Sequence, residues 1–72
     1  MPDNSMAIFV SLEAATKFQA KMEYKPDVFD TCVTREYSRG QLKGYRLTYA
    51  DRLNRRWVVT NDMVDTMTGV PA

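Results

Sequence analysis

The sequence contains no histidine and only one cysteine, Cys32, among its 72 residues. It therefore lacks the commonest general base and the commonest metal ligand of proteins. A lone cysteine can form neither an intrachain disulfide nor the cysteine cluster of a zinc site. Serine and threonine hydroxyls have no histidine to activate them as nucleophiles. We predict a protein that is not an enzyme and that binds no metal and no cofactor.

Long hydrophobic runs are also missing. The longest apolar run near the start covers residues 6–10, whereas a membrane-spanning helix needs about 20 apolar residues. A single cysteine in so small a chain fits a reducing compartment. These features predict a cytoplasmic protein without a membrane partner. The length fits one domain over residues 1–72, and we expect residues 1–5 and 69–72 to fray. A chain of this size has a thin core, which leaves no room for a deep pocket.

The first half of the chain predicts a strand and two helices. Residues 7–10 are apolar and β-prone, and Ser11 suits the N-cap of a helix that ends near Tyr24. The spacing of Leu12, Ala15, Phe18 and Met22 places these four side chains on one buried helix face. Pro26 favours a second helix from Pro26 to about Glu36. The spacing of its apolar residues predicts a buried, purely structural Cys32.

The second half predicts a hairpin and a final helix. Residues 37–44 form a loop, and strict alternation over residues 45–49 predicts a strand whose buried face carries Tyr45, Leu47 and Tyr49. Residues 51–55 connect it to a return strand over 56–60. Asn61 is a suitable N-cap for the last helix, whose apolar edge is Met63, Val64 and Met67 and which ends at Gly69 and Pro71. The class is α+β, in the order β-α-α-β-β-α, with an antiparallel hairpin packed on helices.

Charge is unevenly distributed, although the formal net charge is only +1. Residues 35–56 carry seven cations and two acids, while the rest of the chain carries three cations and seven acids. A positive field at one end of the molecule attracts polyanions. The candidate binding residues are therefore the seven cations of this stretch: Arg35, Arg39, Lys43, Arg46, Arg52, Arg55 and Arg56.

Two short strings, VSLEAA at residues 10–15 and KGYRLTY at residues 43–49, carry a family resemblance. The chain resembles, over residues 8–50, the small nuclease-associated helix-turn-helix repeats of homing endonucleases and phage proteins. The resemblance implies a strand followed by two helices, with DNA contacts from the second helix and the residues after it. The matching positions, mostly structural in that family, are Ser11, Ala14, Ala15, Gly44, Tyr45 and Tyr49.

Two acids lie in the predicted second helix, Asp27 and Asp30, where they would repel phosphates. The hairpin and the loop before it are therefore better candidates for DNA or RNA binding than a recognition helix. The sequence leaves a second function open, namely a phage-type inhibitor or adaptor that docks on a larger host protein. A homodimer is also open, because the N-terminal strand and the hairpin would have free edges.

Overall fold

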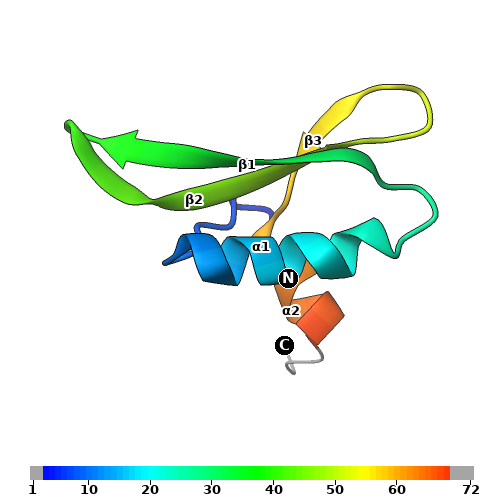
Figure 1. The fold of residues 1–72 in the computed structure, drawn as a ribbon, viewed down its shortest axis with the longest axis horizontal. Helices are drawn as coiled ribbons and strands as arrows, with labels where there is room; N and C mark the ends of the chain where they lie inside the picture. Colours follow the sequence, from blue (N-terminus) through cyan, green and yellow to red (C-terminus); the bar gives the residue numbers. More distant parts are fainter. Residues whose placement is uncertain (1–2, 69–72) are drawn as a thin grey trace.

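A computed structural model describes residues 3–68 of the chain (Figure 1). The elements follow the order α1 (Leu12–Glu23), β1 (Phe29–Ser38), β2 (Gln41–Ala50), β3 (Arg56–Val58) and α2 (Asn61–Thr68). The three strands form one antiparallel sheet in the order β1-β2-β3. The predicted α+β class and the antiparallel hairpin are confirmed, whereas the predicted order β-α-α-β-β-α is wrong.

Helix α1 begins where the sequence predicts. The Ser11 hydroxyl oxygen accepts a hydrogen bond from the backbone N–H of Ala14 at 3.1 Å, as an N-cap does. Ala15, Phe18 and Met22 are buried, as predicted, but Leu12 is half-exposed. Since three residues rotate a helix by about 300°, Leu12 lies roughly 60° from Ala15 and 120° from Phe18 around the axis. It therefore lies at the border of the buried stripe.

The predicted second helix is wrong, because strand β1 occupies most of that segment. Thr31, Val33 and Thr34 are β-branched and favour a pleated surface, and β2 pairs with the segment along most of its length. Cys32, predicted to be buried, is exposed. In a strand, successive side chains point to opposite faces, so Cys32 points away from the core that Val33 contacts. The helix-turn-helix arrangement that the family resemblance implies is not formed here.

The connection between β1 and β2 is a two-residue turn rather than the predicted loop over residues 37–44. Arg39 and Gly40 both have positive φ, at 53° and 76°, as the type I′ turn of tight hairpins requires. Glycine adopts this conformation without steric cost. The short turn lets both strands continue to the tip of the hairpin, where Ser38 pairs with Gln41.

Strand β2 is central in the sheet and confirms the strand predicted over residues 45–49, with extensions at both ends. Leu47 is fully buried, and Tyr45 and Tyr49 are half-buried. At Gly44 a Cβ atom would lie 2.5 Å from the carbonyl oxygen of Phe9, a distance that only glycine permits. This close approach lets Phe9 and Tyr45 exchange backbone hydrogen bonds of 2.8 and 2.9 Å.

The N-terminal segment does not form the strand predicted over residues 7–10. It makes two isolated bridges, Met6 with Thr60 and Phe9 with Tyr45. Residues 3–5, which the sequence predicts to fray, contact the start of α2: the backbone N–H of Asn61 donates to the carbonyl of Ser5 at 2.9 Å. The other segments predicted to fray, residues 1–2 and 69–72, lie outside the described residues.

The predicted return strand over 56–60 is shortened to β3, and α2 follows it. Asn61 is the first residue of α2 rather than its cap. The Thr60 hydroxyl oxygen instead accepts a hydrogen bond from the backbone N–H of Met63 at 3.3 Å. Met63, Val64 and Met67 pack against the core, as predicted. The predicted end of this helix at Gly69 and Pro71 lies outside the described residues.

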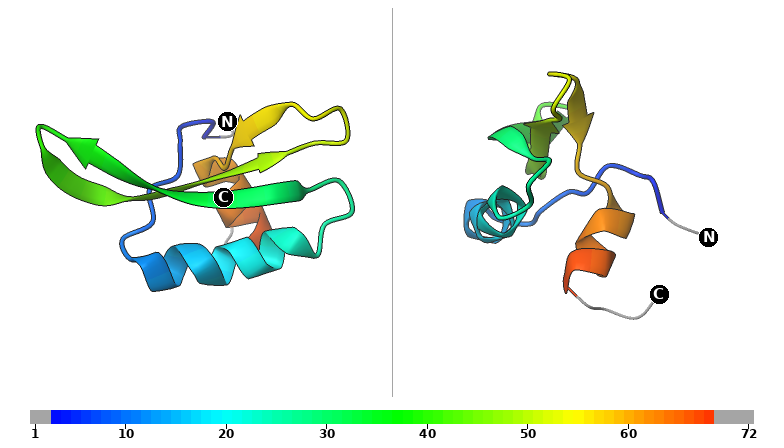
Figure 2. Two further views of the ribbon diagram at one scale, coloured as in Figure 1. Left: turned by 45° about the horizontal axis from the view of Figure 1, so that its top comes forward. Right: turned by 90° about the vertical axis from the view of Figure 1, so that its right-hand side faces the viewer.

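The core lies between the sheet and the helices, and its buried members are Ala7, Phe18, Met22, Leu47 and Val59. Both helices lie on the same side of the sheet (Figure 2). The β1–β2 hairpin is longer than the layer of helices beneath it, so its tip extends past the start of α1 (Figure 1). This overhang places part of the basic segment at one end of the molecule.

Candidate functional site

The overhanging tip of the hairpin is the most exposed part of the sheet. All seven residues from Tyr37 to Lys43 are exposed, and we call this segment the hairpin arm. Its base is the pair formed by Glu36 and Gly44, where the N-terminal segment crosses β2. The arm is therefore a two-stranded ribbon, held by its own ladder and free of contact with the core.

The seven predicted cations do not form one surface. Four of them form ion pairs of 2.7–2.8 Å with acids: Arg46 with Glu36, Arg52 with Asp27, Arg55 with Asp51 and Arg56 with Asp30. Within residues 3–68, the remaining three cations have no acidic side chain at ion-pair distance. Arg39 and Lys43 belong to the arm, and Arg35 precedes it on β1. Among the seven candidate cations, those without a counter-charge thus lie on the arm or close to its base.

Arg46 is a candidate binding residue whose charge is neutralised by an ion pair. The sequence predicts that its side chain faces solvent, whereas it is only 39% exposed and bonds to Glu36 across the two strands at 2.7 Å. Because Arg46 pairs directly with Thr34, the ion pair runs diagonally over the sheet face that has no helix. The ion pair therefore stabilises the base of the arm, and Glu36 neutralises the charge of Arg46.

The other predicted cluster lies at the β2–β3 turn and is organised by Asp51. This carboxylate accepts hydrogen bonds from the indole N–H of Trp57 at 2.9 Å, from the backbone N–H groups of Leu53 and Arg55, and from the Arg55 guanidinium. The hydrogen bond from Trp57, followed by that from the Arg55 backbone, holds the pKa of Asp51 well below its usual range. Asp51 is thus a structural centre of the turn.

The arginines around this turn are engaged in the same way. The Arg55 guanidinium lies 5.6 Å from the centre of the Trp57 ring, a cation–π distance. The Arg56 guanidinium donates to Asp30 and to the hydroxyl of Thr48, both at 2.8 Å. Arg52 bonds to Asp27 on the preceding loop. Arg52 and Arg56 join the turn and β3 to neighbouring segments, and Arg55 is bonded within the turn, so all three are poor candidates for binding a polyanion.

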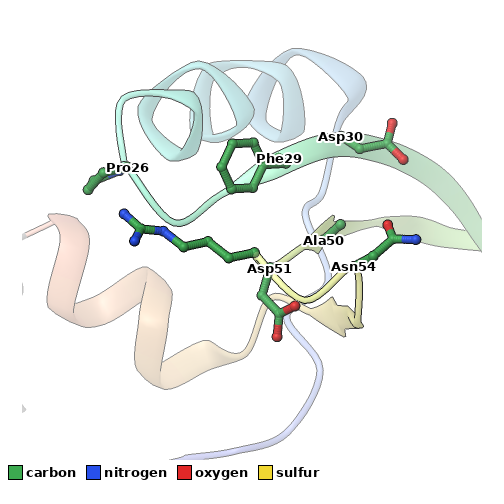
Figure 3. Close-up of a pocket in the computed structure, with 7 residues that line it drawn as sticks. Pro26, Phe29, Asp30, Ala50, Asp51 and Asn54 are labelled. Atoms are coloured by element: carbon green, nitrogen blue, oxygen red, sulfur yellow. The ribbon is translucent and has the colours of Figure 1, made fainter.

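A cleft of about 470 Å³ lies at this same end of the molecule (Figure 3). The ring of Phe29 lies between the loop that carries Pro26 and the β2–β3 turn, and the carboxylates of Asp30 and Asp51 point away from it. Large apolar side chains are exposed nearby along the chain, namely Leu53 at 71% and Trp57 at 48%. Sequence reasoning missed this cleft, because it placed Phe29 inside a helix.

The two faces of the arm differ chemically. Tyr37 pairs with Leu42, and Ser38 pairs with Gln41. Since paired residues share a face and successive residues alternate, one face of the arm is apolar and the other is polar. Sequence reasoning missed all four residues because it assigned them to a loop. The signal that could have located the hairpin is Arg39-Gly40 between two β-prone segments.

Among residues 3–68, no three or more histidine, cysteine, aspartate or glutamate side chains lie together in a way that could hold a metal ion. Neither described helix is long and apolar enough to cross a membrane.

These features define a small α+β domain with a three-stranded antiparallel sheet and a projecting basic hairpin. Comparison with protein-family models, curated proteins and solved structures finds no match to the chain.

Proposed function

We propose that the protein binds nucleic acid, and specifically DNA, through the hairpin arm. The observation that supports this function is the segregation of the cations. Four of the seven predicted residues are neutralised by acids, while Arg39 and Lys43 on the arm and Arg35 next to its base are exposed and have no such partner. Arginine suits this role because its planar fork donates two hydrogen bonds to one phosphate.

The pairing pattern also sets the expected strength of the electrostatic contribution. On duplex DNA, each phosphate that the protein neutralises makes the slope of log affinity against log salt concentration more negative by about 0.9. With phosphate contacts from three cations instead of all seven, the expected slope of log affinity against log salt concentration is near −2.7. This slope corresponds to about a 40-fold loss of affinity between 50 and 200 mM salt. A fluorescence anisotropy titration of a labelled 20-base-pair duplex measures this slope.

The decisive variant replaces the three cations of the site, as R35Q/R39Q/K43Q. We expect it to lose most of the affinity for the duplex at 50 mM salt and most of the salt dependence, because the unpaired positive charge is gone. The chain offers a matched control, K17Q/K21Q/K25Q, which removes the same charge from α1 and the loop after it. Equal losses in the two variants would show that net charge, rather than the arm, binds DNA.

A second candidate function is protein binding at the opposite end of the molecule. Leu53 and Trp57 are exposed and belong to the β2–β3 segment, which also supplies Asp51, Arg52 and Asn54 to the lining of the cleft that contains Phe29. Aromatic and arginine residues at a cleft are typical of interaction hot spots. Because the charges at this end are paired, its expected occupant is an uncharged, apolar side chain of a partner protein.

Selection of a displayed random-peptide library against the immobilised protein tests this candidate. Enriched peptides should share an apolar anchor and should lose binding to the Leu53→Ser variant. Leu42→Ser is the matched control, because Leu42 is an exposed leucine on the arm. A library without enrichment, or peptides that bind both variants alike, would exclude protein recognition by the cleft.

A further inference from the structure

We infer that the hairpin arm enters the major groove of B-form DNA with its tip first, and that Arg39 and Gln41 contact the edges of bases there. This inference rests on the proposed function and deepens it. Phosphate contacts fix only the position of a protein on DNA, whereas contacts to base edges provide sequence preference. The structure supports such contacts through the dimensions of the arm, the chemistry of its tip and the positions of its cations.

The dimensions of the arm match those of the groove. Beyond its base the arm extends by about three residues per strand, or roughly 10 Å at 3.3 Å per residue. The major groove of B-form DNA is about 8.5 Å deep and 12 Å wide, and it admits a two-stranded ribbon. Two strands about 4.8 Å apart leave room for side chains within that width. The arm is therefore long enough to reach the groove floor and narrow enough to enter.

The tip of the arm presents groups that suit base edges. Arg39 is the first residue of the turn, and Gln41 follows Gly40 directly. Arginine donates two hydrogen bonds to guanine, and glutamine forms a matching pair with adenine. Open space surrounds the Cα atom of Gly40, where an added Cβ would meet nothing within 4 Å. Without a side chain at that position, the backbone of the tip can approach the bases closely.

The other two cations are placed for the phosphates. Arg35 precedes the turn residue Arg39 by four residues on β1, and Lys43 follows the turn residue Gly40 by three residues on β2. At 3.3 Å per residue, Arg35 lies about 13 Å and Lys43 about 10 Å back from the tip, and both distances exceed the groove depth of about 8.5 Å. With the tip at the groove floor, one cation on each strand is therefore level with the phosphate backbones.

Two other nucleic acids fit the arm less well. Proteins that bind single strands stack successive bases on several aromatic side chains, whereas Tyr37 is the one aromatic residue between residues 37 and 43. The major groove of A-form RNA is too deep and narrow for side chains to read. The arm therefore favours duplex DNA over single-stranded DNA and over duplex RNA.

The test is a selection of binding sites from a duplex DNA library with 20 randomised base pairs, followed by anisotropy titrations on the selected duplexes. We expect the full chain to enrich sequences with a preference at neighbouring positions. Arg39→Lys keeps the charge but loses the planar fork, so preference at one position should fall about tenfold while affinity for random duplex DNA is retained. Gln41→Ala should abolish preference at a second position.

Arg35→Lys is the matched control, because a phosphate contact does not depend on the sequence. It should leave the preferences of the native chain unchanged. Circular dichroism checks that each variant is folded, as expected for substitutions at exposed positions. Binding of duplex DNA without base preference, preferences unchanged in Arg39→Lys and Gln41→Ala, or equal affinity for single strands or duplex RNA would overturn this inference alone. Absence of binding to every nucleic acid would overturn the proposed function as well.

Discussion

At the scale of single residues, ion pairing separates arginines that look equivalent in the sequence. Arg39 and Arg55 are both exposed cations in hairpin turns. Arg55 is bonded to the carboxylate of Asp51 at 2.7 Å, while Arg39 has no such partner among residues 3–68. A polyanion can recruit Arg39 without breaking an existing bond. The availability of each cation, rather than its charge alone, therefore defines the site.

Asp51 gives a pH-dependent prediction at the same scale. Its pKa is lowered in the folded protein by the hydrogen bond from Trp57 and those from Arg55 and Leu53, so the contribution to stability is present above the ordinary pKa near 3.8 and is lost as the pH falls further. We expect Asp51→Asn to melt at a lower temperature than the native chain at pH 7, and the difference to shrink between pH 4 and pH 2. Thermal melts followed by circular dichroism measure both effects.

Asp65→Asn is the control, because Asp65 is an exposed acid on α2 and lies away from the β2–β3 turn. It should follow the melting curve of the native chain at each pH. A constant difference between Asp51→Asn and the native chain down to pH 2 would contradict the assigned role of the charged carboxylate.

At the scale of elements, the β1–β2 turn combines a structural demand with a functional one. The first turn residue has a φ of 53°, which asparagine adopts more readily than arginine does. Arg39 is therefore not the most stable choice for this position. Residues at binding sites often lower stability in this way.

The prediction is that Arg39→Asn raises the stability of the protein by about 1 kcal/mol while it weakens binding to duplex DNA. Arg39→Ala removes the same charge but has no preference for positive φ, so it should weaken binding equally without the gain in stability. Urea denaturation and anisotropy titrations distinguish the two effects. A rise in stability in both variants would show that repulsion among the cations, rather than turn geometry, limits the hairpin.

At the scale of the whole molecule, the arm with its unpaired cations and the hydrophobic core lie at different positions along the 35 Å long axis. The arm lies at one end, and the loop that carries Asp27 lies at the other with the β2–β3 turn (Figure 1). This separation orients the molecule in the field of a polyanion, with the arm leading. Strand β1 is an edge of the sheet, so association of two copies through it stays a prediction that sedimentation can measure.

The thin core makes the whole fold sensitive to single substitutions. Among residues 3–68, Leu47 is one of the largest side chains that are fully buried, and a leucine-to-alanine change in a core costs about 2–5 kcal/mol. A chain of 72 residues has roughly 4–11 kcal/mol of stability in total. We therefore expect Leu47→Ala to be partly or fully unfolded at 37 °C, as judged by circular dichroism.

Leu42→Ala tests the same change on the arm, where the leucine is half-exposed. Its free energy of unfolding should stay within about 0.5 kcal/mol of the native value, as is usual for surface substitutions. A comparable loss in both variants would contradict the separation between the core and the arm.

The sequence by itself determined the α+β class, the buried faces of α1 and β2, the edge of α2 and the basic character of residues 35–56. Each of these features follows from local periodicity or from composition, and both can be read directly from the sequence. The tertiary structure decided that residues 29–38 are a strand, because β2 supplies their hydrogen-bonding partner and local propensity alone does not.

The tertiary structure also decided which cations are available. The partners of Arg46, Arg52 and Arg56 lie 10, 25 and 26 residues away in the sequence, so no local pattern could predict their pairing. Folding brings these three acids onto three of the seven cations, a fourth cation pairs locally with Asp51, and the remaining three lie on the arm or next to its base. A charge count locates the basic segment, but only the long-range contacts show which part of it can bind.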